Sequence, residues 1–142
     1  VMEYALELVV VPVSDVDRAK AFYERCGFRL DSEHGTDAGF RVVQLSPPGS
    51  ACAIAIGSGM PQAEPGTTKG LHLVVEDIEA AQADLTGKGI PVSEPFHFGP
   101  EGMAPGPDPA RQSYNSFLQF PDPDGNVWLV QEVHRAAGGS PS

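Results

Sequence analysis

The stretch Val13-Ser14-Asp15-Val16-Asp17-Arg18-Ala19-Lys20-Ala21-Phe22-Tyr23, which continues to Gly27-Phe28, decides the fold of this chain. It combines the end of a strand, a polar helix cap, one amphipathic helix and a glycine that ends the helix. The pattern returns in Val75-Glu76-Asp77-Ile78-Glu79-Ala80-Ala81, which runs on to Gly89-Ile90 at a constant offset of 62 residues (Asp15 to Asp77). Such an offset indicates an internal duplication. The sequence therefore predicts two copies of one unit, with any binding site where the copies meet.

Length and charge limit the possible functions. The chain has 142 residues and a formal net charge of -10, which suits one compact acidic domain. A nucleic-acid partner is disfavoured because phosphate binding needs a basic surface. No apolar run is long enough for a membrane span and no signal peptide is visible, so we expect a cytoplasmic protein without a membrane partner. Cys26 and Cys52 form neither a disulfide framework nor a metal-binding spacing.

The first half reads as one strand, one helix and three further strands. Residues 4–13 are rich in Leu and Val and are predicted to form the first strand. Ser14 is the predicted N-cap of the helix, and Gly27 is the predicted left-handed residue that closes it. Three more strands are predicted: one begins with residues 28–31, and the others cover 39–46 and 51–56.

The second half repeats this order after a linker at residues 57–69. We expect a strand at 70–75, a helix at 77–88, a strand at 92–98 and final strands at 113–120 and 127–133. The Asp-Gly-Asn sequence at 124–126 predicts a tight turn between the last two strands. Residues 99–112 are rich in proline and glycine and are expected to lack regular structure, as a lid or binding loop. Residues 135–142 are expected to form a flexible tail.

Each half therefore has one helix for one sheet, and a single helix covers only one face. The other face of each sheet must contact the second half, a partner chain or a ligand. The module boundaries that follow are residues 4–56 and 70–134, within a single domain.

Three motifs resemble those of a known family. The segment Val11-Pro12-Val13-Ser14-Asp15-Val16, the repeat at 75–90 and Phe120-Pro121-Asp122-Pro123-Asp124-Gly125-Asn126 are similar, in this order, to the opening, second-module and closing motifs of the vicinal oxygen chelate superfamily. That family includes glyoxalase I, bleomycin-resistance proteins and extradiol dioxygenases. The resemblance implies an α+β fold of two tandem βαβββ modules whose mixed sheets form a cup, often in a homodimer.

The resemblance also marks four positions at which the family's metalloenzymes place His, Glu or Gln ligands. Three of them fall on Leu8, Gly70 and Leu129, and the remaining one falls within residues 51–59, which contain no acid, His or Gln. Leucine and glycine side chains have no lone pair for a metal, and an open site needs about three protein ligands. We therefore expect no standard metal site and no cofactor.

Two polar residues are best placed to contact a ligand. His72 is two residues from Gly70, and Gln131 is two residues from Leu129, so each shares a strand face with a marked position. His72 is the candidate acid–base residue. The alternative is a histidine satisfied within the sheet. The full set of candidate ligand-binding residues is Leu8, His72, His97, Arg111, Tyr114, Leu129 and Gln131.

Two candidates carry alternatives of their own. His97 lies between two phenylalanines before the long loop, and with His72 and a carboxylate it would make a non-standard metal site. Arg111 leaves the same loop as Tyr114 and either closes over a ligand or pairs with Asp108 at the surface.

Three functional hypotheses remain open. The first is a metal-free binding protein that sequesters a small, partly aromatic or cationic compound, as the resemblance to bleomycin-resistance proteins implies. The second is a metal-independent isomerase, lyase or cyclase in which His72 transfers protons. The third is a metal-dependent lyase or dioxygenase, which the four marked positions disfavour.

Overall fold

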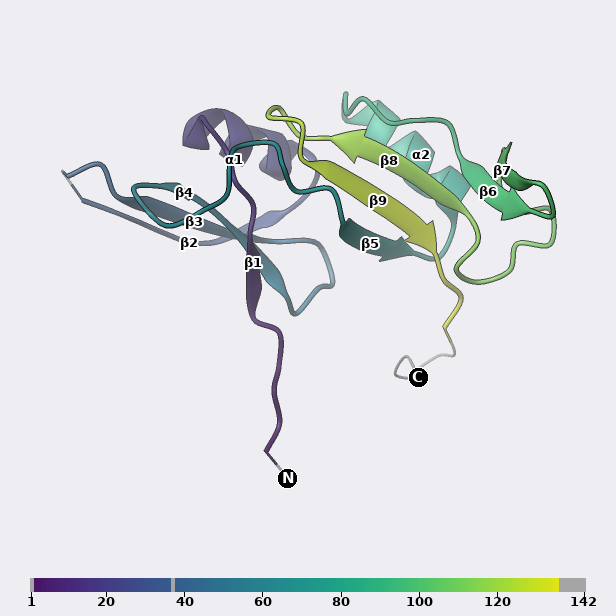
Figure 1. The fold of residues 1–142 in the computed structure, drawn as a ribbon, viewed down its shortest axis with the longest axis horizontal. Coiled ribbons are helices and arrows are strands. Elements are labelled where there is room, and N and C mark those ends of the chain that lie inside the picture. Colours follow the sequence, from purple (N-terminus) through teal and green to yellow (C-terminus); the bar gives the residue numbers. More distant parts are fainter. Residues whose placement is uncertain (1, 37, 136–142) are drawn as a thin grey trace. The chain divides into compact units, whose positions relative to one another are not determined.

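The computed structural model describes residues 2–36 and 38–135 and divides the chain into two compact units (Figure 1). The first unit extends to Thr68 and includes the turn Asp122–Asn126, and the second contains Lys69–Pro121 and the chain from Val127 onward. The predicted tail beyond residue 135 lies outside the described residues. Within the described ranges, no helix has the length and apolar character that crossing a membrane requires.

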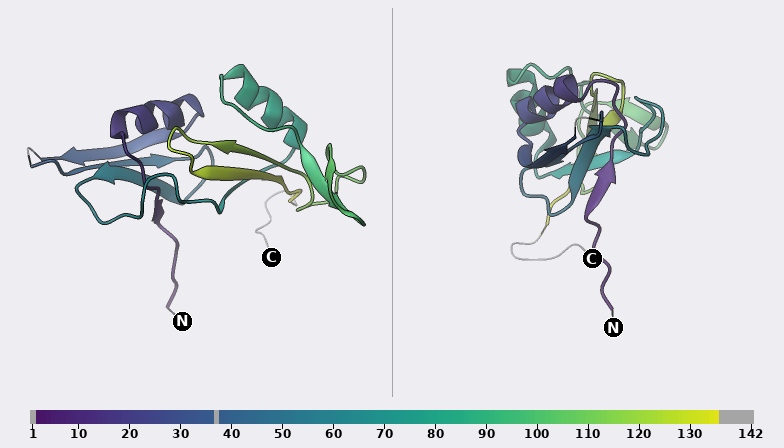
Figure 2. Two further views of the ribbon diagram at one scale, coloured as in Figure 1. Left: turned by 45° about the horizontal axis from the view of Figure 1, so that its top comes forward. Right: turned by 90° about the vertical axis from the view of Figure 1, so that its left-hand side faces the viewer.

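The first unit packs one helix against one face of a four-stranded sheet. Its elements are β1 (Leu8–Val10), α1 (Val16–Arg25), β2 (Arg29–Gly35), β3 (Arg41–Ser46) and β4 (Ala53–Ser58). The strand order is β1-β4-β3-β2, in which β1 runs parallel to β4 and the other pairs are antiparallel. Helix α1 buries Val16, Ala19, Phe22 and Tyr23 and contacts β3 and β4 (Figure 2).

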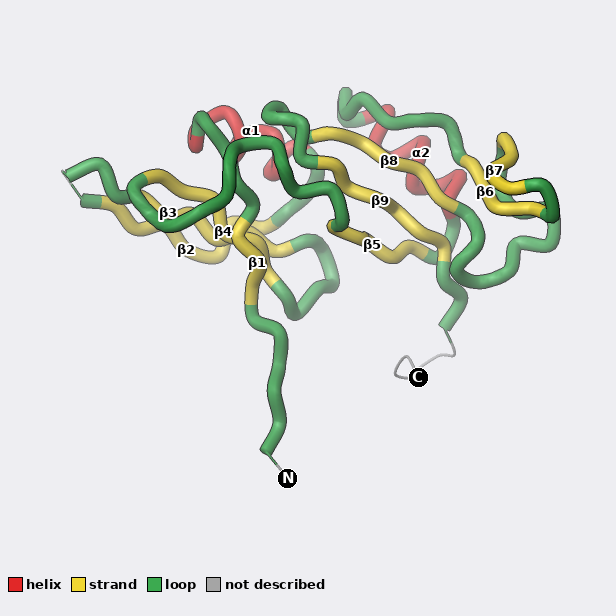
Figure 3. Tube along the Cα trace, in the orientation of Figure 1, coloured by secondary structure: helices red, strands yellow, loops and turns green. Residues whose placement is uncertain are grey.

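The second unit repeats this plan with one strand added. Its elements are β5 (Leu71–Val75), α2 (Ile78–Gly87), β6 (Phe96–Gly99), β7 (Gly102–Pro105), β8 (Phe117–Pro121) and β9 (Val127–Glu132), shown by type in Figure 3. The strand order is β5-β9-β8-β6-β7, and β5 runs parallel to β9. Helix α2 contacts β8 and β9. The predicted α+β class with two tandem modules is confirmed.

The duplication appears in the caps of both helices. Asp15 and Asp77 are the N-caps, and each side chain accepts a hydrogen bond from a backbone N–H in the first turn. After each helix, Gly27 and Gly89 have φ of 102° and 77°. The N–H groups of each glycine and of the next residue bond back to the last turn, as in a Schellman motif. The prediction of Ser14 as N-cap is wrong by one residue, because its hydroxyl donates instead to Asp124, at 2.5 Å.

The strand predicted at 113–120 covers only Phe117–Pro121. Two further predicted boundaries are wrong for identifiable reasons. Strand β1 covers only Leu8–Val10 rather than 4–13, because its partner β4 begins at Ala53, opposite Leu8. Strand β6 begins at Phe96 rather than at residue 92, immediately after Pro95, which has no N–H for a strand ladder.

The expectation that residues 99–112 lack regular structure is wrong for Gly102–Pro105. These residues form β7, which pairs with β6 in a hairpin that closes at the facing pair Gly99 and Gly102. Gly102 has φ of 102°, a conformation that a non-glycine residue adopts only with strain. Pro105 is tolerated because β7 is an edge strand. The glycines and prolines therefore build an extra strand at this edge of the sheet.

Candidate functional site

The sheet of the second unit has one face buried under α2 and one face that is more exposed. Along β9, Trp128, Val130 and Glu132 are buried, whereas the alternating Leu129 and Gln131 are only partly buried. We call the second surface the open face. It carries two cross-strand rows: His72, Leu129 and Gln119 form one, and Val74, Gln131 and Phe117 form the other.

An aromatic cluster extends the second row toward β6. Phe117 pairs with Phe96 across the strands, and their rings stack with centroids 5.4 Å apart. Phe98 meets Phe117 edge-to-face at 5.5 Å. The exposed fractions are 8% for Phe117 and 53% for Phe98, so the cluster has a buried base and an accessible rim. Such ring pairs are rigid and present apolar surface with little loss of conformational entropy on binding.

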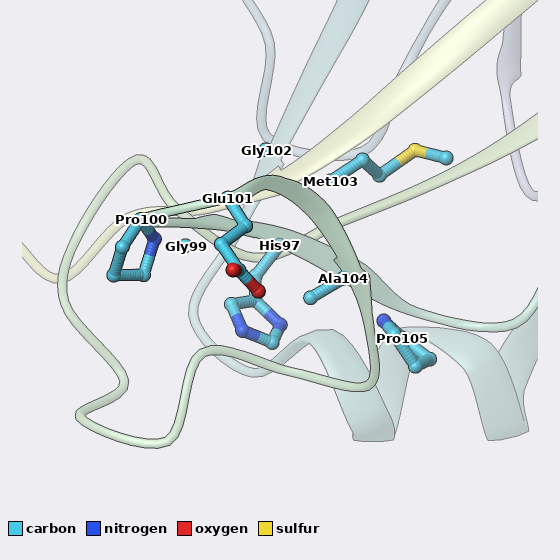
Figure 4. Close-up of a pocket in the computed structure, with 8 residues that line it drawn as sticks. All are labelled: His97, Gly99, Pro100, Glu101, Gly102, Met103, Ala104 and Pro105. Atoms are coloured by element: carbon cyan, nitrogen blue, oxygen red, sulfur yellow. The ribbon is translucent and has the colours of Figure 1, made fainter.

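A groove of 370 Å³ lies beside this cluster, between the β6–β7 hairpin and β8. Its lining residues are Ser93, Glu94, Pro95, Phe96, Met103, Ala104, Pro105 and Gln119. A separate hollow of 460 Å³ is lined by His97 and the turn of the hairpin, and Figure 4 shows Met103 extending away from the His97 ring. The groove could not be predicted from the sequence because the residues that form β7 were expected to lie in a loop. The alternation of Phe96, His97 and Phe98 lies within the strand predicted at 92–98 and gives no signal for β7.

The two histidines do not meet. His72 is exposed on β5 and lies on the open face, where it pairs with Leu129. His97 alternates with Phe96 and Phe98 on β6, so its ring lies on the other face, where Nδ1 is 2.8 Å from the carbonyl oxygen of Gly106. Strands β9 and β8 separate the two histidines. Within the described ranges no hydrogen bond or ion pair engages the His72 side chain, and the suggested His72–His97 metal pair does not form.

Gln131 and Tyr114 act together at the edge of the open face. Gln131 Nε2 donates to the carbonyl oxygen of Tyr114 at 3.0 Å, and the Tyr114 N–H donates to the carbonyl oxygen of Glu132 at 2.8 Å. These bonds hold Tyr114 at φ of 73° with 53% of the residue exposed. A non-glycine residue in this conformation is strained, and such strain is concentrated at functional sites. The structure thus presents an exposed phenol on a fixed backbone.

Arg111 has many partners on the α2 side of the sheet. Its Nη2 lies 2.7 Å from Glu132 Oε1, and its other contacts reach Glu79 and Asp77 at the start of α2. The Arg111 side chain does not pair with Asp108. The two residues share only a backbone hydrogen bond, in which the Arg111 N–H donates to the carbonyl oxygen of Asp108. The alternative of an Arg111–Asp108 surface pair is therefore not observed.

Glu132 is the buried partner in this network, with a side-chain exposure of 0%. Besides Arg111, it accepts hydrogen bonds from the N–H of Ile78 and lies 2.9 Å from His134 Nε2. The hydrogen bond from Arg111 is the main reason that the pKa of Glu132 is lowered to about 2, and the Ile78 N–H adds to it. Carboxylate partners raise the pKa of Arg111. The pair therefore stays ionised and anchors the loop that carries Tyr114.

Asp108 organises the same loop. Its carboxylate accepts hydrogen bonds from the N–H groups of Gln112 and Ala110, and the first of these is the largest cause of its lowered pKa. Its own N–H donates to Ser116 Oγ at 2.9 Å. Residues 106–112, the last part of the 99–112 segment expected to be a lid or binding loop, are thus held in place by hydrogen bonds within the loop and to Ser116.

The four positions marked for metal ligands do not fit a metal. Leu8 lies on the sheet face of the first unit opposite α1, with Ala53 as its cross-strand partner. In the second unit, Leu129 of β9 pairs with His72 of β5. The duplicated position in the first unit is Ala55 of β4, which pairs with Val10 of β1. Together with Gly70, Leu8, Leu129 and Ala55 offer no side-chain donor atom. In residues 2–36 and 38–135, no three His, Cys, Asp or Glu side chains are grouped to hold a metal ion. That the protein works without a metal remains a prediction.

Comparisons with known proteins agree on one family. A model of the Glyoxalase/Bleomycin resistance protein/Dioxygenase superfamily matches residues 5–130. The crystal structure of TnmS3, an antibiotic binding protein from Streptomyces sp. CB03234, is 29% identical over 94% of this chain and 99% of that chain, with a TM-score of 0.72.

Two further solved structures are similar. A glyoxalase/bleomycin resistance protein from the same Streptomyces strain is 30% identical over 90% of this chain and 100% of its own, with a TM-score of 0.68. A superfamily member from Sphaerobacter thermophilus DSM 20745 is 28% identical over 93% and 99%, with a TM-score of 0.69. No curated protein matches the chain.

Proposed function

The chain belongs to the Glyoxalase/Bleomycin resistance protein/Dioxygenase superfamily, and from this membership we propose that it binds a small antibiotic-like organic molecule without a metal. The observation that carries the proposal is the open face of the second unit. There, Leu129, Val74 and the aromatic cluster form accessible apolar surface beside a few polar groups, the composition typical of small-molecule sites. The proposed function is sequestration, in which the ligand is held without a chemical step.

Two further findings support this proposal. TnmS3, which is described as antibiotic binding, is similar to this chain over nearly its full length. The positions at which family metalloenzymes hold their ion carry hydrocarbon side chains or hydrogen here, and these favour apolar contact over metal coordination.

Each candidate residue has a role in the proposal. Leu129 supplies apolar contact on the open face, and the expectation that Leu8 of the first unit contacts a ligand stays a prediction. His72 and Gln131 offer hydrogen bonds, and Tyr114 covers the ligand with its phenol. Arg111 acts through its loop rather than by direct contact, because its guanidinium is engaged by three carboxylates. His97 lies on the other face of the sheet and is therefore a weaker candidate for ligand contact on the open face. The homodimer and the cytoplasmic location implied by the sequence are part of the proposal, and the mass in solution tests the first.

A thermal-shift screen against an antibiotic library that includes bleomycin-type drugs tests the function. A ligand at about one hundred times its Kd adds about 2.7 kcal/mol to the free energy of unfolding, a clear increase in Tm. Failure of every compound to raise Tm would contradict the proposal.

We expect Leu129→Asp to weaken binding of any compound found in this way by at least about tenfold, equivalent to about 1.4 kcal/mol. The new carboxylate would have to lose water against an apolar ligand surface. Isothermal titration calorimetry measures the loss. Leu30→Asp is the matched control, because Leu30 is 39% exposed on β2 of the first unit, and its affinity should stay near that of the unmodified chain. Equal losses in both variants would count against the open face as the site.

A further inference from the structure

We propose that the groove beside β7 binds a planar aromatic cation, with the ring against Phe96 and Met103 and the positive charge at Glu94. This inference rests on the proposed function, since it names the class of ligand and adds a subsite to the open face. Strand β7, which the two-module plan does not require, would then have a role in binding.

The floor of the groove is rigid. Phe96 is half-buried and is held by its stack on Phe117 and by the edge of Phe98 at 6.2 Å. Phe96 faces Pro105 across the β6–β7 pair, so a second inflexible side chain lies next to the ring. A flat ring bound here would lose little entropy to rearrangement of the protein, because the aromatic surface is already ordered.

Met103 supplies an adaptable wall. It is 70% exposed, and it pairs with Phe98 across the hairpin, on the same face as Phe96. Its thioether is polarisable and packs well against aromatic edges. Met103 and Phe96 together fit the two sides of a planar aromatic group.

The polar end of the groove favours a cation. Glu94 is the only charged residue in the lining, and its Oε2 accepts a hydrogen bond from Gln82 Nε2 on α2, at 3.1 Å. The bond orients this carboxylate in the lining of the groove and leaves acceptor capacity on the other oxygen. No Lys or Arg lines the groove to compete for this carboxylate. An ammonium or amidine next to an aromatic ring matches both features.

The groove is continuous with the open face. Gln119 lines the groove and pairs with Leu129, which in turn pairs with His72. The Gln119 N–H donates to Ser93 Oγ and its carbonyl oxygen accepts from the Ser93 N–H, so this corner is well ordered. A larger ligand would place its aromatic cation in the groove and its remaining atoms along the row that contains Leu129.

Two probes of the same shape test the charge. 9-Aminoacridine is a planar cation at neutral pH, and acridine is its neutral counterpart. Fluorescence titration of the full chain at low ionic strength should show the cation binding more tightly, with an affinity that falls as salt is added. Equal affinity for the two probes, or no binding of either, would overturn the proposal.

Two variants locate the site. Glu94→Gln keeps the shape and the acceptor for Gln82, and it should weaken the cation about fivefold while leaving acridine unchanged. Glu101→Gln is the matched control, because Glu101 lies on the same hairpin and lines the other hollow. Met103→Ser should weaken both probes about fivefold, and Met2→Ser, at an exposed methionine of the first unit, should weaken neither. Losses of the same size in a variant and its control would contradict the site.

The inference and the proposed function fail in different ways. An antibiotic that stabilises the chain and is insensitive to Glu94→Gln and Met103→Ser would leave the function standing and refute the groove. Binding of 9-aminoacridine with the expected variant pattern, but without a stabilising antibiotic, would support the groove and contradict the function.

Discussion

Replacement of Glu132 by glutamine is expected to lower the free energy of unfolding by about 3 kcal/mol at pH 7. The side chain is completely buried, and glutamine preserves its size while removing the charge that Arg111 faces at 2.7 Å. Breaking a buried pair by neutralising one partner is more costly than losing a surface pair, because the remaining charge keeps its desolvation penalty. Arg111 retains 35% exposure, so water offsets part of the loss and the lower end of the usual range applies.

Urea denaturation followed by far-UV circular dichroism measures this loss. Glu79→Gln is the matched control, since Glu79 contacts the same guanidinium but is 63% exposed. It should change the midpoint little, as surface pairs generally do. Similar midpoints for both variants would mean that Glu132 does not hold the loop.

The same pair predicts an acid dependence. The pKa of Glu132 falls from its ordinary 4.5 to about 2 on folding. A carboxyl with a lowered folded-state pKa contributes stability that is complete above its unfolded pKa and is lost as pH falls toward the folded one. The advantage of the unmodified chain over Glu132→Gln, about 3 kcal/mol at neutral pH, should therefore shrink between about pH 4.5 and pH 2. An advantage that is constant across this window would contradict the assignment.

The sequence predicted the parts of the fold that depend on local patterns. Gly27 and Gly89 act within a single turn of chain and Asp15 recurs as Asp77, so the repeat could be recognised without a structure, although the cap itself was predicted at Ser14 instead of Asp15. The alternation along β9 placed Leu129 and Gln131 on one face and Trp128 on the other, because strand geometry has a fixed period of two. These features require no knowledge of distant contacts.

The candidate site depends on distant contacts and was predicted only in part. Arg111 was expected near a ligand or Asp108, but its partner Glu132 is 21 residues away, and only the fold brings the two together. The groove was missed because β7 has glycine and proline at its ends, and at an edge such residues are compatible with a strand. Residues 106–112 were expected to be a loop, but 113–116 were wrongly predicted as strand. All of them belong to one loop whose order comes from contacts of Asp108, Ser116 and Gln131.

Asp122 lies in a short turn motif that is held by contacts with residues distant in the sequence. Its turn lies in the first unit, although it joins β8 and β9. The residue is 4% exposed, and its carboxylate accepts from Tyr23 Oη at 2.7 Å and from three groups of the turn itself: the N–H of Asp124 and both the N–H and Nδ2 of Asn126. Asn126 Nδ2 also donates to the carbonyl oxygen of Pro12. The motif thus ties the turn to the beginning of the chain.

Asp122→Ala is therefore expected to destabilise the first unit by about 4 kcal/mol. The substitution removes one acceptor from four donors, of which Asn126 Nδ2 keeps its bond to Pro12. Each buried donor left without a partner costs roughly 1–3 kcal/mol, less than additively because the turn relaxes. Hydrogen exchange should show faster exchange for the amides of Asp124 and Asn126, which lose their partner directly. Urea denaturation gives the total.

Two controls separate the network from its parts. Tyr23→Phe removes only the bond from the phenol and should cost about 1 kcal/mol, because the aromatic packing of the ring is kept. Asp84→Ala removes a carboxylate of 58% exposure on α2 and should have little effect. If Asp122→Ala cost no more than Tyr23→Phe, the bonds within the turn would contribute nothing, and the motif would be held by its backbone conformation alone. We expect Asp122→Ala to cost more stability than Tyr23→Phe, because several buried donors share this one carboxylate and no neighbouring group can accept all of them.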